Sequence, residues 1–484
     1  MTKQSRSNSL EIDRDCHASF HLARNDMVFL DHLRNSPISF WIDSSGGPEK
    51  LCKQSFFSIN PKYYLYGSLN EITLEDCETG AISYVPGNCF NTLEEKLKEE
   101  KKNKNGIFVG YVSYDLFKAN LKAISYPDFF FAFFDNYSTL DPNLSAFSSQ
   151  FSACNPLTSC LLPLASNMSD EEYLEKVKQI KKEIKAGNVY QVNLTREYSI
   201  ETTDNRQRTT ALDLYLRLRE VSPNPYGCFF KTPFVSILSS SPEEFLYIGP
   251  VTGDKGQETT DQGPETKTHS SILTPQSYII RTRPIKGTLP KGVFEIDPKN
   301  KAENLMIVDL ERNDLGRICK PGTIKVNELL NIEEYKHLNH VVSSIEGKLK
   351  NNITLKEIFE ATFPGGSITG APKIAAMKII DELEPTPRGA YTGSFGYIKT
   401  DGTMNFNILI RTIFVQSCLS LRAKRSNPDR DCFVDTLVSP RNDKFRVTFN
   451  VGGGIVADSD PHAELEEIKL KAKGIINSIG LDSL

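Results

Sequence analysis

The amino-acid sequence predicts a mixed α+β protein, because it contains both segments with the two-residue period of strands and segments with the 3.6-residue period of helices. The clearest helix is predicted from Ser169, where Glu172 completes a capping box, to a stop at Gly187. Its apolar stripe consists of Tyr173, Val177, Ile180 and Ile184. The clearest strand is KFRVTFNV at 444–451, in which apolar and polar residues alternate. Periodicity therefore indicates the class of fold but not its topology.

Composition divides the chain into two main regions. Residues 28–160 read as strands separated by Pro/Gly turns, and polar sequence at 141–159 marks a boundary before the second region, 161–484. The second region is expected to contain a strand in VYQVNLTREYSI and a hairpin formed by NILIRTIFVQ and KFRVTFNV. Two more helices are predicted there, one starting near Ala371 with a proline just inside its start and one through ELEEIKLKAKGII.

Three polar stretches look like additions to this framework. The blocks RSN, DRDC and RND occur in the same order in the N-terminal extension, residues 1–27, and again at 425–443. The second copy lies in a probable insert, 419–444, at the tip of the predicted hairpin, where an insertion disturbs least backbone pairing. A basic docking patch is the alternative reading. Residues 249–277 contain hardly any apolar side chains and are expected to form a flexible loop.

Composition also excludes several functional classes. Charged residues make up 24% of the 484 residues, the formal net charge is −4, and no polybasic run suggests binding to nucleic acid. The ten cysteines are scattered without a CxxC pair and are interpreted as reduced thiols of a cytoplasmic protein. The aromatic run FFFAFF at 129–134 is too short to cross a membrane. A small-molecule site is therefore expected.

Nine segments carry a family resemblance when they are taken in order. They are YQVNL at 190–194, SSSPEEF at 239–245, RPIKGT at 283–288, AENLMIVDLERNDLGRI at 302–318, HVVSSIEG at 340–347, FPGGSITGAPKIAAMKIIDELEP at 363–385, GAYTGSFGYI at 389–398, ILIRT at 408–412 and GGGIVADSDPHAELEE at 452–467. This series resembles the chorismate-binding family. The resemblance implies an α+β fold like that of anthranilate synthase component I, with two large antiparallel-rich β-sheets packed as a sandwich and flanking helices.

Chorismate carries two carboxylates, so its site needs donors for anions. Gly365-Gly366 and Gly452-Gly453-Gly454 are expected to be turns whose backbone N–H groups approach an anion without a Cβ in the way. A P-loop is disfavoured in GGSITGAPK, because Ala-Pro-Lys follows the last glycine. The resemblance assigns carboxylate contacts to Arg411, which otherwise reads as a strand residue, and to Tyr391. It also implies that Thr369 and Lys471 bind substrate.

A magnesium site is also implied by the resemblance. It makes Glu303 and Glu467 direct Mg²⁺ ligands and has Glu464 hold a metal-bound water, in keeping with the preference of Mg²⁺ for carboxylates and water. Glu464 and Glu467 share one helix face, although by composition alone a solvated acidic helix would explain them. Asn300 stands where many family members carry an acidic residue.

Three residues are expected to carry the chemistry by resemblance. His340 matches a histidine near the leaving hydroxyl, with His337 close enough to confuse the assignment. Glu243 matches a general acid and base. Lys286 matches the lysine of PIKGT, which is typical of aminodeoxychorismate synthases, whereas anthranilate synthases typically read PIAGT. A lysine becomes a nucleophile only when its pKa is lowered, and read without the family Lys286 would be a surface residue.

The resemblance therefore implies Mg²⁺-dependent amination of chorismate at C4, which gives 4-amino-4-deoxychorismate for para-aminobenzoate and folate synthesis. No glutaminase triad region is visible, so a glutamine amidotransferase subunit is expected to supply the ammonia. One alternative is anthranilate synthase component I, which converts chorismate to anthranilate and pyruvate. A lower-ranked alternative is a degraded, non-catalytic chain that only binds a glutaminase.

Overall fold

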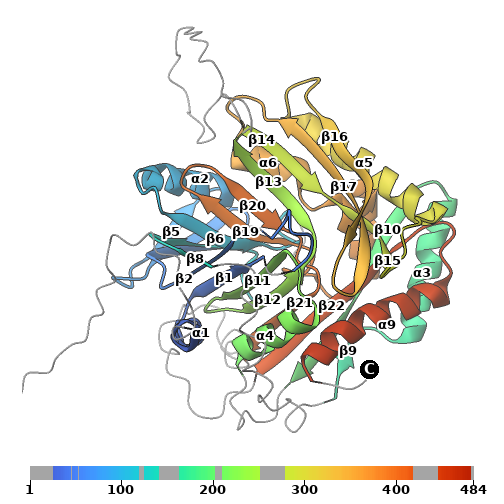
Figure 1. Cartoon of the computed structure of the whole chain (residues 1–484), viewed down its shortest axis with the longest axis horizontal. Coiled ribbons are helices and arrows are strands. Elements are labelled where there is room, and N and C mark those ends of the chain that lie inside the picture. The colour runs from blue at the N-terminus through green and yellow to red at the C-terminus, as the bar shows by residue number, and fades with distance from the viewer. Residues whose placement is uncertain are drawn as a thin grey trace, which may run out of the picture.

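The computed structural model describes residues 26–44, 46–52, 54–118, 125–140, 163–201, 210–250, 278–417 and 445–480. Within these ranges the strands form two antiparallel sheets (Figure 1). The predicted flexible loop and the probable insert at the hairpin tip lie almost entirely outside the described residues, as does most of the N-terminal extension.

The ten-stranded sheet has the order β18-β10-β22-β21-β12-β11-β1-β2-β8, with β9 paired to β10. Its strands are β1 Ser39–Asp43, β2 Ser55–Ile59, β8 Ser138–Leu140, β9 Ala165–Ser166, β10 Gln191–Glu201, β11 Tyr226–Lys231, β12 Ser236–Ser241, β18 Gly370–Ala371, β21 Thr412–Ser417 and β22 Phe445–Ile455. The predicted strand VYQVNLTREYSI is β10, and β21 and β22 pair as the hairpin requires.

The twelve-stranded sheet has the order β15-β17-β14-β13-β20-β19-β6-β7-β3-β4-β5, with β16 paired to β17. Its strands are β3 Tyr63–Gly67, β4 Glu71–Asp76, β5 Ile82–Pro86, β6 Ile107–Val112, β7 Phe129–Phe134, β13 Glu244–Pro250, β14 Tyr278–Arg283, β15 Ile285–Pro290, β16 Lys325–Glu334, β17 Leu338–Lys348, β19 Ser394–Lys399 and β20 Met404–Asn407. Strands from both regions of the sequence occur in both sheets.

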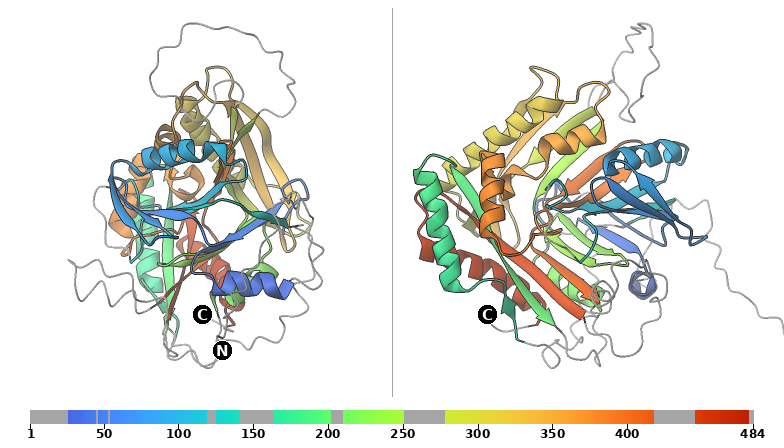
Figure 2. Two further views of the ribbon diagram at one scale, coloured as in Figure 1. Left: turned by 90° about the vertical axis from the view of Figure 1, so that its left-hand side faces the viewer. Right: turned by 180° about the vertical axis from the view of Figure 1, so that it is seen from behind.

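Helices cover the outer faces of the two sheets (Figure 2). Those on the ten-stranded sheet are α1 Asp26–Asn35, α3 Asp170–Lys185, α4 Ala211–Val221, α7 Lys373–Leu383 and α9 Pro461–Ser478. Those on the twelve-stranded sheet are α2 Cys89–Glu99, α5 Pro298–Ile318 and α6 Leu355–Thr362. Short 3₁₀ turns occur at Glu100–Lys102 and Gly366–Ile368. The predicted sandwich with flanking helices is confirmed.

The aromatic run of β7 shows why both faces of a sheet are buried. Phe129, Phe131 and Phe133 pack in the core under α2 and α6, whereas Phe130 and Phe134 pack in the core between the two sheets. Successive side chains of a strand point to opposite faces, so a strand buried on both sides needs a continuous apolar run instead of an alternating one.

Several elements differ from the sequence-based expectation. The helix α3 is confirmed with its capping box between Ser169 and Glu172. In contrast, α1 and α2 fall in the region that was expected to hold only strands and turns. The helix α7 begins at Lys373, two residues after the predicted start at Ala371, because Pro372 is its N-cap residue and Ala371 still belongs to β18.

Candidate active site

A β-bulge determines the position of Lys286. In the pairing of β15 with β17, Ile285 lies opposite Val342 and Thr288 opposite His340, so Lys286 and Gly287 together face one residue. Gly287 has a φ of 103°, which a residue with a Cβ rarely adopts. Bulges re-aim side chains next to functional sites. The Lys286 side chain is buried here, so the expectation that follows from sequence without the family, a surface lysine, is wrong.

The environment of Lys286 lowers the pKa of its amine. Burial is the main cause, and the carboxylates of Glu303 and Glu243 act in the opposite direction. No carboxylate of the described residues lies within ion-pairing distance of this amine. A buried lysine without a direct ion pair holds its proton less tightly, so a larger fraction is the neutral, nucleophilic form.

Glu243 lies in the link between β12 of one sheet and β13 of the other. Its side chain is 3% exposed, and one carboxylate oxygen, Oε1, accepts a hydrogen bond from the Ile285 backbone N at 3.3 Å. The glutamate and the lysine of the β15 bulge therefore meet in space, although the 251–277 segment separates them in sequence. Burial raises the pKa of Glu243 to about 7, so this carboxyl can both donate and accept a proton near neutral pH.

His340 and Arg411 contact each other opposite this pair. Arg411 Nη2 lies 3.2 Å from His340 Nε2, and Thr288 Oγ1 lies 3.2 Å from His340 Nδ1. Guanidinium only donates, so Nε2 is the acceptor and the imidazole carries its proton on Nδ1. Burial, together with the Arg411 charge, holds the pKa of His340 well below its usual value. In this state His340 has no proton on Nε2 to give, and the geometry favours Glu243 as the acid.

Arg411 is a partly buried cation that lacks a carboxylate partner among the described residues. It precedes β21 with a φ of 51° and does not lie within a strand, contrary to the expectation for ILIRT. Burial lowers the pKa of its guanidinium. Uncompensated buried charge is costly, and an anionic ligand would remove that cost. This residue is therefore the strongest candidate for carboxylate recognition.

Tyr335, which the sequence motifs did not single out, lies beside this pair. Its ring meets the His340 imidazole edge-on with centroids 4.8 Å apart. The Tyr335 hydroxyl is buried without a hydrogen-bond partner among the described residues. In contrast, Tyr391 packs in the core between the sheets, where its charged neighbours are Arg388 and Glu384. The carboxylate contact of Tyr391 stays a prediction.

The three predicted metal ligands lie on α5 and α9. Glu464 accepts a hydrogen bond from Ser459 at 2.6 Å and pairs with Lys299 at 3.1 Å. Glu467 pairs with Lys471 at 2.8 Å, and Lys471 also donates to the Gly452 carbonyl at 3.0 Å. Burial raises the pKa of Glu303, and the charges of the other two glutamates add to this rise. The three carboxylates are thus close enough to repel one another.

This crowding of carboxylates fits a divalent cation, because hard oxygen donors are gathered where only lysines now balance them. Among the described residues, however, no three His, Cys, Asp or Glu side chains stand in a metal-binding arrangement. Two of the three glutamates are instead engaged in ion pairs, Glu464 with Lys299 and Glu467 with Lys471. Asn300 is bonded to the helix cap Asp297, so its amide points to the start of α5.

The glycines have other roles than those expected. Gly452, Gly453 and Gly454 are not a turn, because they pair with Thr195, Leu194 and Asn193 inside β22. A Cβ on Gly454 would lie 2.3 Å from Gln191 Nε2, so this glycine leaves room for a side chain of the neighbouring strand β10. A glycine run carries no signal that separates a turn from a strand that is packed closely by neighbouring side chains.

The loop that follows α6 combines close packing with internal hydrogen bonds. A Cβ on Gly366 would lie 2.1 Å from Leu310 Cδ2, so this glycine permits contact with α5. The Thr369 hydroxyl donates to the Gly365 carbonyl at 2.9 Å and is fully buried. Both residues are placed next to the site, but their hydrogen bonds to substrate stay predictions.

Fold and site together define a class of protein: an α+β sandwich with a buried lysine, a titratable glutamate and an arginine that no carboxylate of the described residues pairs with. The sequence matches the family of chorismate binding enzymes over residues 51–253, 271–423 and 436–477. The chain belongs to that family. The gaps in the match fall within the two stretches interpreted as a loop and an insert, an interpretation that stays a prediction.

Named relatives fall into two groups. Anthranilate synthase component 1 of Synechocystis is 37% identical over 329 residues, which are 66% of this chain and 55% of that protein. Aminodeoxychorismate synthase component 1 of Bacillus subtilis is 32% identical over 371 residues, which are 67% of this chain and 72% of that protein. The chain thus spans little more than half the length of the Synechocystis relative. Identity alone does not separate the two activities.

Solved structures support the fold. Anthranilate synthase component I from Streptococcus pneumoniae superposes with a TM-score of 0.61 at 22% identity, covering 87% of this chain and 92% of that one. In the part of the chain that the structure describes, no helix has the length and apolar character of a membrane span. The cytoplasmic location stays a prediction.

Proposed function

We propose that this chain aminates chorismate at C4 with ammonia and forms 4-amino-4-deoxychorismate, a precursor of para-aminobenzoate and folate. The observation that carries the proposal is the buried Lys286 amine, which has a lowered pKa and lies next to Glu243. A direct attack by ammonia on the ring needs no lysine at this position. A lysine held here by a bulge, without a direct ion pair, has the properties of a nucleophile.

Each neighbouring residue then has a role. Arg411 binds a substrate carboxylate through its planar fork, and Tyr335 offers a hydroxyl to the same end of the substrate. Lys286 attacks ring C2 while the 4-hydroxyl leaves with a proton from Glu243, and ammonia then enters at C4 and expels the lysine. His340 accepts the Arg411 hydrogen bond and so orients the guanidinium before substrate binds.

Mg²⁺ is part of the proposal. Glu303 and Glu467 would hold it directly and Glu464 through a water, while Lys299 and Lys471 would give up their present partners. The ion held by these glutamates would supply positive charge for a substrate carboxylate and Lewis acidity for the departure of the hydroxyl. The ion pairs of Lys299 with Glu464 and of Lys471 with Glu467 support this proposal, because they place positive charge beside these carboxylates.

Ammonia would come from a glutamine amidotransferase subunit. The relatives named aminodeoxychorismate synthase component 1 support this only through their similarity. An ammonium salt at alkaline pH replaces that partner in the assay, so the reaction of this chain can be measured alone.

The test is Lys286→Ala, assayed with chorismate, Mg²⁺ and an ammonium salt. We expect loss of aminodeoxychorismate formation, with a small amount of product aminated at C2. The matched control is Lys231→Ala, which removes another partly buried lysine, one that donates to the Arg34 carbonyl away from the site. Unchanged aminodeoxychorismate output from Lys286→Ala would show that the lysine is not the nucleophile.

The second candidate is anthranilate synthase component I, favoured by the 37% identical relative of that name. The product decides between them, because anthranilate is fluorescent and has lost the enolpyruvyl group. A chain that consumed no chorismate with ammonium and Mg²⁺ would instead support the third reading, a non-catalytic glutaminase-binding protein.

A further inference from the structure

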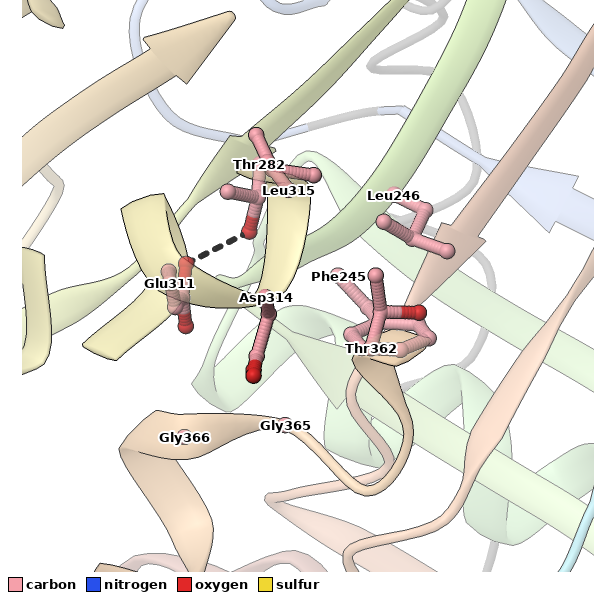
Figure 3. A pocket seen from close by; sticks show the side chains of 9 residues that line it. All are labelled: Phe245, Leu246, Thr282, Glu311, Asp314, Leu315, Thr362, Gly365 and Gly366. Carbon is pink, nitrogen blue, oxygen red and sulfur yellow. Dashed lines mark hydrogen bonds between the residues drawn. The ribbon is translucent and has the colours of Figure 1, made fainter. Parts of the chain in front are cut away.

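A second carboxyl, Glu311 on α5, is buried close to Glu243 and has no role in the proposed reaction. Its side chain is 7% exposed, and Thr282 of β14 donates to one of its oxygens at 2.8 Å (Figure 3). No cation of the described residues pairs with it, because the nearby Lys373 bonds to Asp314 and to the Thr362 carbonyl. A buried carboxyl without a cation is most stable with its proton on.

A small cavity joins Glu311 to the loop beside Glu243. Thr282, Glu311, Asp314, Gly365 and Gly366 form its polar wall, and Phe245, which is two residues from Glu243, closes it on the apolar side (Figure 3). The space is about that of one water molecule.

The loop continues directly from this cavity to the reacting carboxyl. Ser367, the residue after Gly366, lies against the Glu243 carboxyl and lowers its pKa, although it makes no well-formed hydrogen bond. The two glutamates therefore lie on either side of one short, buried loop. Neither is neutralised by an ion pair, so together they form a pair of like groups in a region of low dielectric.

We infer that Glu311 is a positioning residue for Glu243: at neutral pH it stands behind the reacting acid as a second, protonated carboxyl, so that the pair does not carry two negative charges during turnover. The inference rests on the proposed function, because it takes Glu243 as the acid and base of that reaction.

The charges around the pair set the order in which it loses protons. Glu311 faces Thr282 from β14, Glu243 from the link before β13, Asp314 one turn along α5, and Lys373 from α7. Burial, with added repulsion from Glu243 and Asp314, raises the pKa of Glu311 to about 8, while that of Glu243 is about 7. Glu243 accepts the Ile285 N–H bond and lies near the Lys286 amine, and both favour its charged form, so it ionises more readily than Glu311. Ionisation of Glu311 in turn makes Glu243 bind its proton more tightly.

The first experiment measures kcat against pH for wild type and for Glu311→Gln, which keeps the shape and hydrogen bonding but cannot ionise. We expect activity to fall above pH 7 in both, and the ratio of kcat at pH 9 to kcat at pH 7 to be several-fold smaller in the variant. The matched variant Thr282→Val keeps the carboxyl but removes the hydroxyl that favours its charged form. It should change the ratio in the same direction by less. Equal ratios in all three proteins would overturn the inference.

Thermal unfolding against pH gives a readout that needs no activity. The unfolded chain loses the Glu311 proton near its ordinary pKa of about 4.3, whereas the folded protein keeps it to about pH 8, so wild type loses stability as pH rises through this interval. The Tm of Glu311→Gln should therefore exceed that of wild type by a margin that grows from pH 5 to pH 8. A margin independent of pH would overturn the inference. If wild type consumed no chorismate, the proposed function would fail, while a growing margin would still support a protonated Glu311.

Discussion

Replacing Arg411 with methionine should lower activity and raise stability at once. Its partly buried guanidinium lies 3.2 Å from the His340 Nε2 atom and pairs with no carboxylate of the described residues. Methionine keeps the length of the side chain, and the unusual φ of 51° is equally unfavourable for both residues. Removal of an uncompensated buried charge should stabilise the protein by about 1–3 kcal/mol. The same substitution should also weaken substrate binding, and this effect is measured separately from stability.

Charge-assisted hydrogen bonds to a carboxylate contribute about 1.5–3 kcal/mol, which corresponds to a rise in KM of about 10- to 150-fold. The assays are steady-state kinetics with chorismate and thermal unfolding without it. The matched control is Arg388→Met. Arg388 is a buried arginine that donates two hydrogen bonds to the Glu384 carboxylate, at 2.8 and 2.9 Å, and two more to backbone carbonyls.

Arg388→Met removes one partner of the buried Arg388–Glu384 ion pair, which should lower the free energy of unfolding by about 3–5 kcal/mol. The two substitutions, Arg411→Met and Arg388→Met, should therefore change Tm in opposite directions. If Arg411→Met lost as much stability as Arg388→Met, Arg411 would be a structural residue and its assignment to a substrate carboxylate would be refuted.

Three more predictions concern protonation, packing and metal. Because Glu243 has a pKa of about 7 and must donate a proton, the kcat of wild type should fall above pH 7. The variant Glu243→Gln should lower kcat by about 100-fold or more at every pH, and its kcat should no longer show this fall above pH 7. Gly370→Ala should cost about 2–3 kcal/mol in chemical denaturation, because its Cβ would lie 2.1 Å from the Gln191 carbonyl at a φ of 147°, whereas Gly474→Ala in open helix surface should be stabilising. Added Mg²⁺ should raise the Tm of wild type, and EDTA should abolish turnover; a Glu303→Gln variant that kept the full Mg²⁺ shift would contradict its role as a ligand.

Local patterns predicted the elements that are stabilised locally. The capping box at Ser169 correctly predicted the helix α3, and the alternation of apolar and polar residues correctly predicted the strand β22. Residues 26–35 were misread because the helical spacing of Phe29, Leu30 and Leu33 is short and lies next to strand-like sequence. The glycines of β22 were misread as a turn because the partner that makes them strand residues, β10, is far away in sequence.

The sequence predicted which residues form the candidate site, but not how these residues are arranged in space. Resemblance named Lys286, Glu243, His340 and Arg411, and the structure brings them together. Sequence could not show that the arginine lacks a carboxylate, since that depends on every residue packed around it. The sequence also could not single out Glu311. This residue lies within one of the family motifs, but its importance comes from being buried in the structure with no cation to pair with.

The position of β22 has a consequence for synthesis of the chain. This strand is the last of the described strands to leave the ribosome, yet it lies between β10 and β21 inside its sheet. Until residue 455 emerges, both neighbours expose unpaired backbone edges, which are templates for association with other chains. The nascent protein therefore depends on the synthesis of β22 to become resistant to aggregation, and truncation before β22 should yield insoluble chains instead of a smaller folded domain.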